Sequence, residues 1–370
     1  MQVEAPQLVV DIPDNTDFTF WNIPFGVFHL KTEEPTQARC ASRIGDFVID
    51  LAQLEADGHL ASGAFAEVKH QVFNKPTLNH FMDLSRAEWK SVRETLQNLL
   101  KKGSALEGDL SKGADSKYLV TITDVNLLLP AQIGDYTDFY SSYNHAYNIG
   151  CMFRDPKNAV KNNWLWLPVG YHGRASSVVV SGTDLHRPIA QRGAPSAEKP
   201  SYGRCNRMDF ELEVGTFIGN KGNKLGQPIN VKDAENYIFG CTLMNDWSAR
   251  DIQGWEYVPL GPFTGKSLGT VISPWVITLE ALEPFKCSLP EPKIPFLDYL
   301  NDPNYGSYDL KLKAFIQLSG QTEEHQVCTS NYKYLYWSMP QQVTQHTVTG
   351  CNLKTGDLFG SGKQPRTRLN

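Results

Sequence analysis

The chain has 370 residues, of which 41% are hydrophobic and 20% charged, so it can bury a sizeable core in two domains or in one domain with an appendage. Its formal net charge of -5, without a Lys/Arg run, favours a small-molecule partner over nucleic acid or an anionic membrane. No stretch of about 18 apolar residues occurs. The N-terminal MQVEAPQLVVDIPD also lacks the apolar core of a secretion signal, so we expect a cytoplasmic protein.

The first predicted unit is a small β-module that contains FTFWNIPFGVFHL and RIGDFVIDL. Aromatic and β-branched residues with interposed Gly and Pro are typical of short strands joined by turns. A helix is predicted over 85–102, because Ser85 and Glu88 match a capping box and apolar residues then recur at helical spacing.

The next segment, GSALEGDLSKGADSK over 103–117, is rich in Gly and Ser and has no periodicity, which predicts a surface linker or a long loop. We therefore expect one domain over 1–118 and a catalytic domain over 119–370. Prolines, glycines and alternating runs such as SSVVVSG, MDFELEV and GTVISPWVITL favour a mostly β structure in the second domain. The predicted fold class is mainly β, within α+β. The seven scattered cysteines include no CxxC pair, and we expect buried or free thiols.

The run MDFELEVGTF carries acids at alternate positions. In a strand, Asp209, Glu211 and Glu213 would share the face opposite the apolar side chains, and a solvated strand face is the alternative interpretation. Asp138 and Asp246 stand among aromatic and apolar residues, where a buried carboxylate needs a partner. Oxygen-only ligands favour a hard cation over zinc. The sequence thus predicts a Mg2+ or Ca2+ site at Asp138, Glu211, Glu213 and Asp246.

Polar residues between 138 and 172 are further candidates. His145 is a candidate general base because imidazole titrates near neutrality, and a core histidine is the alternative. Arg154 could bind a substrate carboxylate, or form an ion pair with Asp155. Tyr171 and His172 lie in the turn-rich LPVGYHGRASS, whose glycines suit either close approach to a ligand or a plain β-turn.

The segment WSARDIQGWEYVPLGPFTGKSLGT has an unusual density of side chains able to bind or polarise a ligand near Asp246. This density indicates a functional site. The residues concerned are Arg250, Gln253, Tyr257, Lys266 and Thr270.

Ordered blocks along almost the whole chain resemble the fumarylacetoacetate hydrolase family. They are DYTDFYSSYNHAYNIGCMFR, NNWLWLPVGYHGRASS, MDFELEV, LMNDWSARDIQGWEYVPLGPFTGKSLGT and YWSMPQQVTQHTVTGCNL, within a match from PFGVF near Phe25 to GDLFGSG at Gly362. The resemblance implies a small SH3-like N-terminal barrel, a mixed β-roll catalytic domain and a homodimer. It also implies hydrolysis of a β-diketone acid, 4-fumarylacetoacetate, to fumarate and acetoacetate in tyrosine and phenylalanine breakdown.

The same resemblance implies roles for single residues, carried over by matching motifs. The four acids would hold Ca2+, and Mg2+ would be placed by Asp246, Thr270 and an oxygen of Lys266, because an ammonium cannot ligate a cation. His145 would be the catalytic residue, with Lys266 and Arg250 offsetting charge on an oxyanion. Substrate contacts would come from Tyr140, Arg154, Tyr171, Gln253 and Tyr257.

After Gly362 the chain departs from the family pattern. Lys363 stands where the family has a substrate-contacting threonine, and the chain ends at Asn370, before a glutamate that orients the catalytic histidine in the family. KQPRTRLN is basic and lacks strand alternation, which we interpret as an alternative or frameshifted terminus. One alternative function is therefore a catalytically impaired family member that binds metal or pairs with full-length subunits. Another is a related diketone- or oxaloacetate-cleaving enzyme, against which the elaborated WSARDIQGWEYVPLGPF argues.

Overall fold

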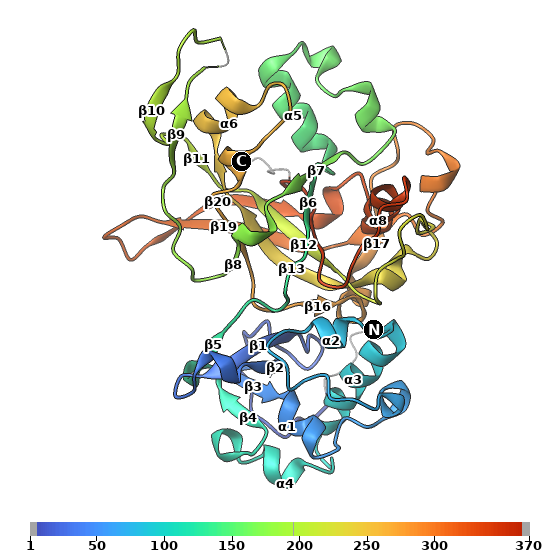
Figure 1. Ribbon diagram of the computed structural model, residues 1–370. Helices are drawn as coiled ribbons and strands as arrows, with labels where there is room; N and C mark the ends of the chain where they lie inside the picture. Colours follow the sequence, from blue (N-terminus) through green and yellow to red (C-terminus); the bar gives the residue numbers. More distant parts are fainter. Residues whose placement is uncertain (1–5, 195, 365–370) are drawn as a thin grey trace.

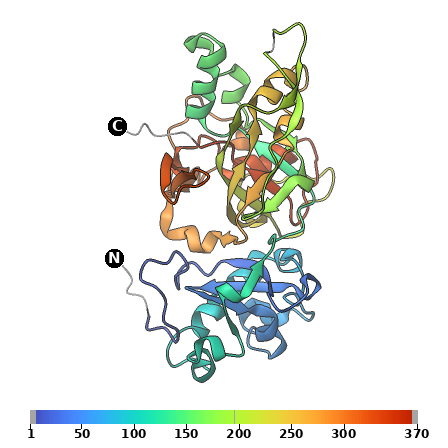
Figure 2. The same ribbon diagram turned by 90° about the vertical axis from the view of Figure 1, so that its left-hand side faces the viewer.

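A computed structural model describes residues 6–194 and 196–364 of the chain, and Figures 1 and 2 show two regions stacked one on the other. The N-terminal region, blue to cyan, contains a small sheet, and the larger region, green to red, contains a mixed sheet with helices around it. The predicted mainly β, α+β class, with a small β unit ahead of a larger one, is confirmed. None of the helices in the described ranges combines the length and the apolar character needed to cross a membrane.

The N-terminal region is built on an antiparallel five-stranded sheet in the order β4-β3-β2-β1-β5. Its strands are β1 (Phe25–Leu30), β2 (Arg39–Ile44), β3 (Phe47–Asp50), β4 (Leu119–Thr121) and β5 (Val125–Leu127). Its helices are α1 (Leu51–Ala56), α2 (Asn79–Met82), α3 (Arg86–Leu99) and α4 (Glu107–Leu110). The helix predicted over 85–102 is α3, and the capping box of Ser85 and Glu88 is confirmed.

The segment 103–117, predicted as a surface linker or a long loop, is not a loop throughout. It contains α4, and Leu106 and Leu110 are buried in the core of the N-terminal region, an apolar pair that the Gly/Ser content obscured. The division after residue 118 stays a prediction. Strands β4 and β5 follow that residue and pair with β3 and β1, which favours moving the division to the segment between Leu127 and Tyr136.

One continuous apolar core joins the two regions. The ring of Phe239, in the mixed sheet, lies with its centroid 5.1 Å from that of Trp89 and 5.6 Å from that of Phe81. Phe25 and Val276 also exchange two backbone hydrogen bonds of 2.8 Å. The mixed sheet therefore rests on the N-terminal region through both apolar packing and backbone pairing.

The mixed sheet of the larger region has the order β7-β6-β21-β12-β13-β15-β8, with β16 also paired to β13. Its pairs are antiparallel except for β21 with β6 and β15 with β8. The strands are β6 (Tyr136–Phe139), β7 (Gly170–Gly173), β8 (Val178–Val180), β12 (Leu212–Ile218), β13 (Ile238–Asp246), β15 (Thr270–Ile272), β16 (Ile277–Thr278) and β21 (Leu358–Gly360).

Short ladders and helices surround this sheet. The ladders pair β9 (Ile189–Arg192) with β10 (Ser201–Arg204), β11 (Met208–Asp209) with β14 (Ser248–Ala249), β17 (Lys286–Ser288) with β18 (Gly306–Tyr308), and β19 (Lys311–Gln317) with β20 (Glu324–Asn331). The helices are α5 (Tyr143–Phe153), α6 (Arg250–Glu256), α7 (Leu279–Leu282) and α8 (Met339–Thr347).

The run MDFELEV is not one uninterrupted strand. It divides into β11 and β12, which pair with different partners, β14 and β13. At the other end of the chain, most of the tail predicted to lack strand alternation, residues 365–370, lies outside the described residues. Gln364 is described and buried, and its backbone N–H donates to the backbone carbonyl of Leu212 at 2.9 Å.

Candidate metal and catalytic site

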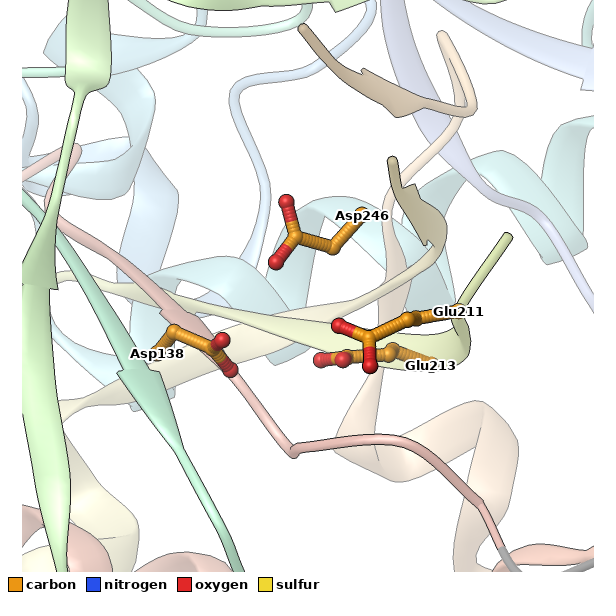
Figure 3. A group of neighbouring side chains, drawn as sticks. All are labelled: Asp138, Glu211, Glu213 and Asp246. Atoms are coloured by element: carbon orange, nitrogen blue, oxygen red, sulfur yellow. The ribbon is translucent and has the colours of Figure 1, made fainter. Parts of the chain in front are cut away.

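Four carboxylates meet where neighbouring strands of the mixed sheet begin or end. Asp138 lies in β6, Glu213 in β12 and Asp246 at the end of β13, while Glu211 immediately precedes β12. One potential ligand atom from each lies within 4.8 Å of the others, and Figure 3 shows the carboxylates turned toward a common space. The exposed fractions are 0% for Glu213 and 6% for Glu211, so the solvated-face alternative is wrong.

Gly360 makes room for two of these side chains. It lies in β21, between β6 and β12, and pairs with Asp138 on one side and with Gly215 on the other. A Cβ at this position would lie 3.0 Å from Glu213 Oε2 and 3.1 Å from Asp138 Oδ1. That spacing is tighter than an ordinary van der Waals contact, so a residue without a side chain suits the strand between the two carboxylates.

The local electrostatics fit a divalent cation. Burial, followed by the negative charge of neighbouring carboxylates, raises the pKa values of Asp138 and Glu213 well above their ordinary range. For Asp138 the neighbour with the largest effect is Asp246. Asp138 Oδ1 and Glu213 Oε1 are buried and have no hydrogen-bond partner among the described residues. Buried acceptors without donors, together with an all-oxygen donor set, suit a hard divalent ion. The residues present therefore fit such an ion.

Lys266 offsets the negative charge of Glu211 and Asp246, on the other side of the cluster. Its ammonium is buried, forms ion pairs with Glu211 and Asp246, and donates to Ser248 Oγ at 3.0 Å. Burial alone would lower the pKa of Lys266, but the adjacent carboxylates raise it above its ordinary value. The side chain is thus held as an ammonium, and Thr270 Oγ1 donates to Asp246 Oδ1 at 2.6 Å beside it.

Arg250, the first residue of α6, contacts the outer side of Glu211. Its Nη2 donates to Glu211 Oε1 at 2.6 Å, and its Nη1 donates to Gln253 Oε1 at 3.0 Å. Burial would raise the pKa of Glu211, but Lys266 and Arg250 hold it below its ordinary range. Among the four carboxylates, Glu211 is therefore kept ionised by protein cations, whereas Asp138 and Glu213 rely on a ligand.

His145 lies near the start of α5. The hydroxyl of Ser142, the N-cap, accepts from the His145 amide at 3.2 Å, and the imidazole meets the ring of Tyr140 edge-on with centroids 5.3 Å apart. Burial, opposed by the charge of Glu211 and assisted by Lys363 and Arg250, lowers the pKa of His145 to about 4. The imidazole is consequently neutral near pH 7, the form that accepts a proton.

The predicted substrate-contacting residues occupy different surroundings. Tyr171 pairs with Asp138 across β7 and β6, and burial together with the charge of Asp138 raises its pKa. Tyr257 is 53% exposed after α6. For Arg154, the alternative of an ion pair with Asp155 does not occur within the described residues, and its Nη2 donates instead to the carbonyl of Ala159 at 2.6 Å.

Two residues of this surrounding network were not among the sequence-predicted site residues. Asp209 accepts from Arg250 Nε at 3.0 Å and from Lys363 Nζ at 2.8 Å. Asp209 belongs to the same alternating run as Glu211 and Glu213, and that alternation was its only sequence signal. For Lys363 the only signal was its place at the family's substrate-contacting threonine, and its pairing with Asp209 could not be predicted, because 154 positions separate the two residues and only the fold joins them.

Two protein-family models together match most of the chain. The model described as "Fumarylacetoacetase N-terminal" matches residues 21–130, and the one described as "Fumarylacetoacetate (FAA) hydrolase C-terminal" matches 136–366. The second match ends four residues past Gly362, and the alternative terminus after that residue stays a prediction.

Similarity over most of the chain accompanies these matches. The chain is 49% identical over 354 residues to fumarylacetoacetase of Bos taurus and 48% identical over 355 residues to that of Caenorhabditis elegans, covering 95% of this chain and 83% of each relative. A solved structure of a putative HpcE protein from Mycobacterium smegmatis shares the fold at a TM-score of 0.50 and 14% identity, covering 91% of this chain and 86% of that one.

Proposed function

This chain belongs to the fumarylacetoacetase family and is a hydrolase of the carbon–carbon bond of fumarylacetoacetate; we propose how its residues carry out that reaction. The observation that supports the proposal most strongly is the buried cluster of Asp138, Glu211, Glu213 and Asp246. The products would be fumarate and acetoacetate. The alternative of a catalytically impaired family member is not favoured by a match over 95% of the chain.

The four carboxylates would hold a divalent ion, with Ca2+ and Mg2+ as the candidates. When bound, such an ion polarises a carbonyl and stabilises the enolate that leaves when the carbon–carbon bond breaks. Thr270 would support the site by fixing Asp246 through its 2.6 Å hydrogen bond. Lys266 would offer the ion its backbone oxygen, because its ammonium cannot ligate a cation and forms ion pairs with Glu211 and Asp246.

His145 would act as the general base that removes a proton from the attacking water. Its neutral imidazole near pH 7 supports this role. Lys266 and Arg250, with Gln253 held on Arg250 Nη1, would offset negative charge on the tetrahedral oxyanion. Both cations are fixed before substrate arrives, so little reorganisation would be needed as that charge develops.

The remaining residues would bind and orient the substrate. Arg154 would anchor a terminal carboxylate through the guanidinium nitrogen that is not bonded to the 158–159 carbonyls. Tyr140 and Tyr257 would contact the substrate beside His145, and the influence of Tyr257 on the pKa of Tyr140 supports their proximity. Tyr171 would line the same space from the side of Asp138.

We also propose a homodimer in the cytoplasm. The buried free thiols of Cys40, Cys205 and Cys241 suit a reducing compartment. Light scattering of the purified chain should give twice the chain mass of 41.5 kDa. A particle of single-chain mass at micromolar concentration would contradict the dimer.

Product analysis tests the proposed reaction. The purified chain, incubated with 4-fumarylacetoacetate and Mg2+ or Ca2+, should form fumarate and acetoacetate in equal amounts, as followed by proton NMR. The matched control is Lys333→Met, which removes a partly exposed ion pair to Asp309 that involves none of the site residues. Substrate that remains intact with a folded, metal-supplemented chain would rule out the proposed reaction.

A further inference from the structure

Lys363 has a mostly buried side chain beside the metal site, and the proposed reaction gives this ammonium no role. Its side chain is 10% exposed, and its Nζ lies 2.8 Å from Asp209 Oδ2. The same nitrogen lies 5.6 Å from the centroid of the Phe210 ring. Long cationic side chains usually extend into water, so a lysine held inward at this position needs a reason.

The residues on either side of Lys363 fix its backbone against the site. The amide of Gly362 donates to Glu213 Oε2 at 2.9 Å, and Gly362 has a φ of +79°. A Cβ on Gly362 would lie 2.4 Å from the carbonyl oxygen of Phe139. The next residue, Gln364, donates a backbone hydrogen bond from its N–H to the carbonyl of Leu212. Lys363 is thus held between β6 and β12, directly after Gly362, whose backbone N–H contacts the proposed metal ligand Glu213.

Lys363 shares its partner with Arg250. Asp209 Oδ2 accepts from Lys363 Nζ and also from Arg250 Nε at 3.0 Å and Nη2 at 2.7 Å. Arg250 also pairs with Glu211, so the two cations balance the two carboxylates, and loss of Lys363 would leave this corner with a net negative charge. Arg250 further donates to Glu211 and Gln253, so four of its five N–H groups are engaged within the described part of the chain.

The field of Lys363 reaches the catalytic residues. After the larger effect of burial, Lys363 is among the charges that lower the pKa of His145. It also contributes to holding the pKa of Glu211 down, after Lys266 and Arg250. A charge that acts on both the general base and a metal ligand is well placed to act on an anionic substrate in the same space.

We propose that Lys363 is a positioning residue of the active site. By sharing Asp209 with Arg250, it holds the guanidinium against Glu211 and offsets the charge of Asp209, so that an anionic group of the substrate is not repelled. The inference rests on the proposed function for its kinetic consequence. The one uncommitted N–H of Arg250 would then meet that anionic group, while Lys363 acts through Asp209 and through its field.

Charge removal with the hydrogen bond retained tests the inference. Lys363→Gln can still donate to Asp209 but lacks the charge, and Lys363→Arg restores it. We expect Lys363→Gln to raise KM about tenfold with kcat changed by less than about twofold, because the uncompensated charge of Asp209 would repel the anion in ground and transition states alike. Lys363→Arg should return KM to within about twofold of the parent, and Lys333→Met should behave as the parent.

A binding measurement makes the test independent of turnover. Titration calorimetry with fumarate, an unsaturated dicarboxylate, should show about tenfold weaker binding for Lys363→Gln and near-parental binding for Lys363→Arg. If the parent binds fumarate in this pattern without cleaving the diketone, the proposed function fails and the inference stands. Equal fumarate affinity of parent and Lys363→Gln would overturn it. A loss that Lys363→Arg does not restore would also overturn it, because shape and not charge would then be responsible.

Discussion

Gly360 and Glu213 lie so close across β21 and β12 that a Cβ on Gly360 would be 3.0 Å from Glu213 Oε2. Asp138 Oδ1, on the opposite neighbour strand, would be 3.1 Å away. The strand that separates two proposed metal ligands therefore carries no side chain at the level of their carboxylates. The shape of the cluster depends on this residue as much as on the acids themselves.

Gly360→Ala should weaken metal binding with little effect on the fold. The added methyl group would push Glu213 and Asp138 apart by a few tenths of an ångström, which lowers affinity for an ion that requires defined oxygen positions. Calorimetric titration with Mg2+ and with Ca2+ measures the change. Gly108→Ala is the matched control, because a Cβ there meets nothing within 4 Å. Unchanged affinity in Gly360→Ala would contradict this account of the site.

Metal ions should raise the thermal stability of the chain. Asp138 and Glu213 carry raised pKa values because they are buried among like charges, and a bound divalent ion relieves that repulsion. At a concentration of 100 times Kd, an ion bound only by the folded state adds about 2.7 kcal/mol to the free energy of unfolding. Glu213→Gln should be more stable than the parent without metal and should lose most of the metal response. Asp309→Asn, at an exposed ion pair, serves as the control.

His145→Ala should abolish cleavage and leave metal binding intact. The side chain supplies the proposed general base, while no ligand carboxylate is touched by its removal. Turnover is followed by loss of substrate, and binding by calorimetry with Mg2+ on the same preparation. A variant that cleaves the diketone at near-parental rate would refute the assignment of His145, whereas loss of metal affinity would indicate that it supports the ligands.

The imidazole of His145 should titrate near pH 4. Its pKa in the folded, metal-free chain lies below that of an ordinary histidine, about 6.5, so the unfolded chain takes up a proton first as the pH falls. The free energy of unfolding therefore decreases as the pH falls from about 6.5 toward 4, because the folded state keeps this imidazole neutral over that window. NMR titration of the metal-free chain, with His145→Gln to assign the resonance, measures the midpoint. A midpoint at 6.5 would contradict the buried environment.

Local sequence patterns predicted those features that depend on neighbouring residues. The capping box of Ser85 and Glu88 formed because its two hydrogen bonds join positions three apart. The alternation of Glu211 and Glu213 brought both acids to the cluster, although the strand breaks before Glu211. Whether the pair was solvated or buried could not follow from that run, because the partners, Asp138 and Asp246, come from other strands.

Long-range pairings escaped prediction for the same physical reason. Lys363 meets Asp209 across 154 positions, and Lys266 meets Glu211 across 55. Arg154 turned to backbone carbonyls beyond α5 rather than to Asp155, since the chain after α5 presents those oxygens at short range. Motif resemblance supplied roles for several residues, but at position 363 this chain has a lysine in place of the family's threonine, so no role could be carried over to Lys363.

Metal-dependent hydrolysis of 4-fumarylacetoacetate is tested most directly by following the diketone's ultraviolet absorbance with the purified 370-residue chain. Samples treated with a chelator, and the same samples after Mg2+ or Ca2+ is restored, should be compared at equal protein concentration. We predict that absorbance falls with the metal-restored chain and stays constant with the chelated one. Constant absorbance in both samples, from a chain that binds the metal and is folded, would contradict the account.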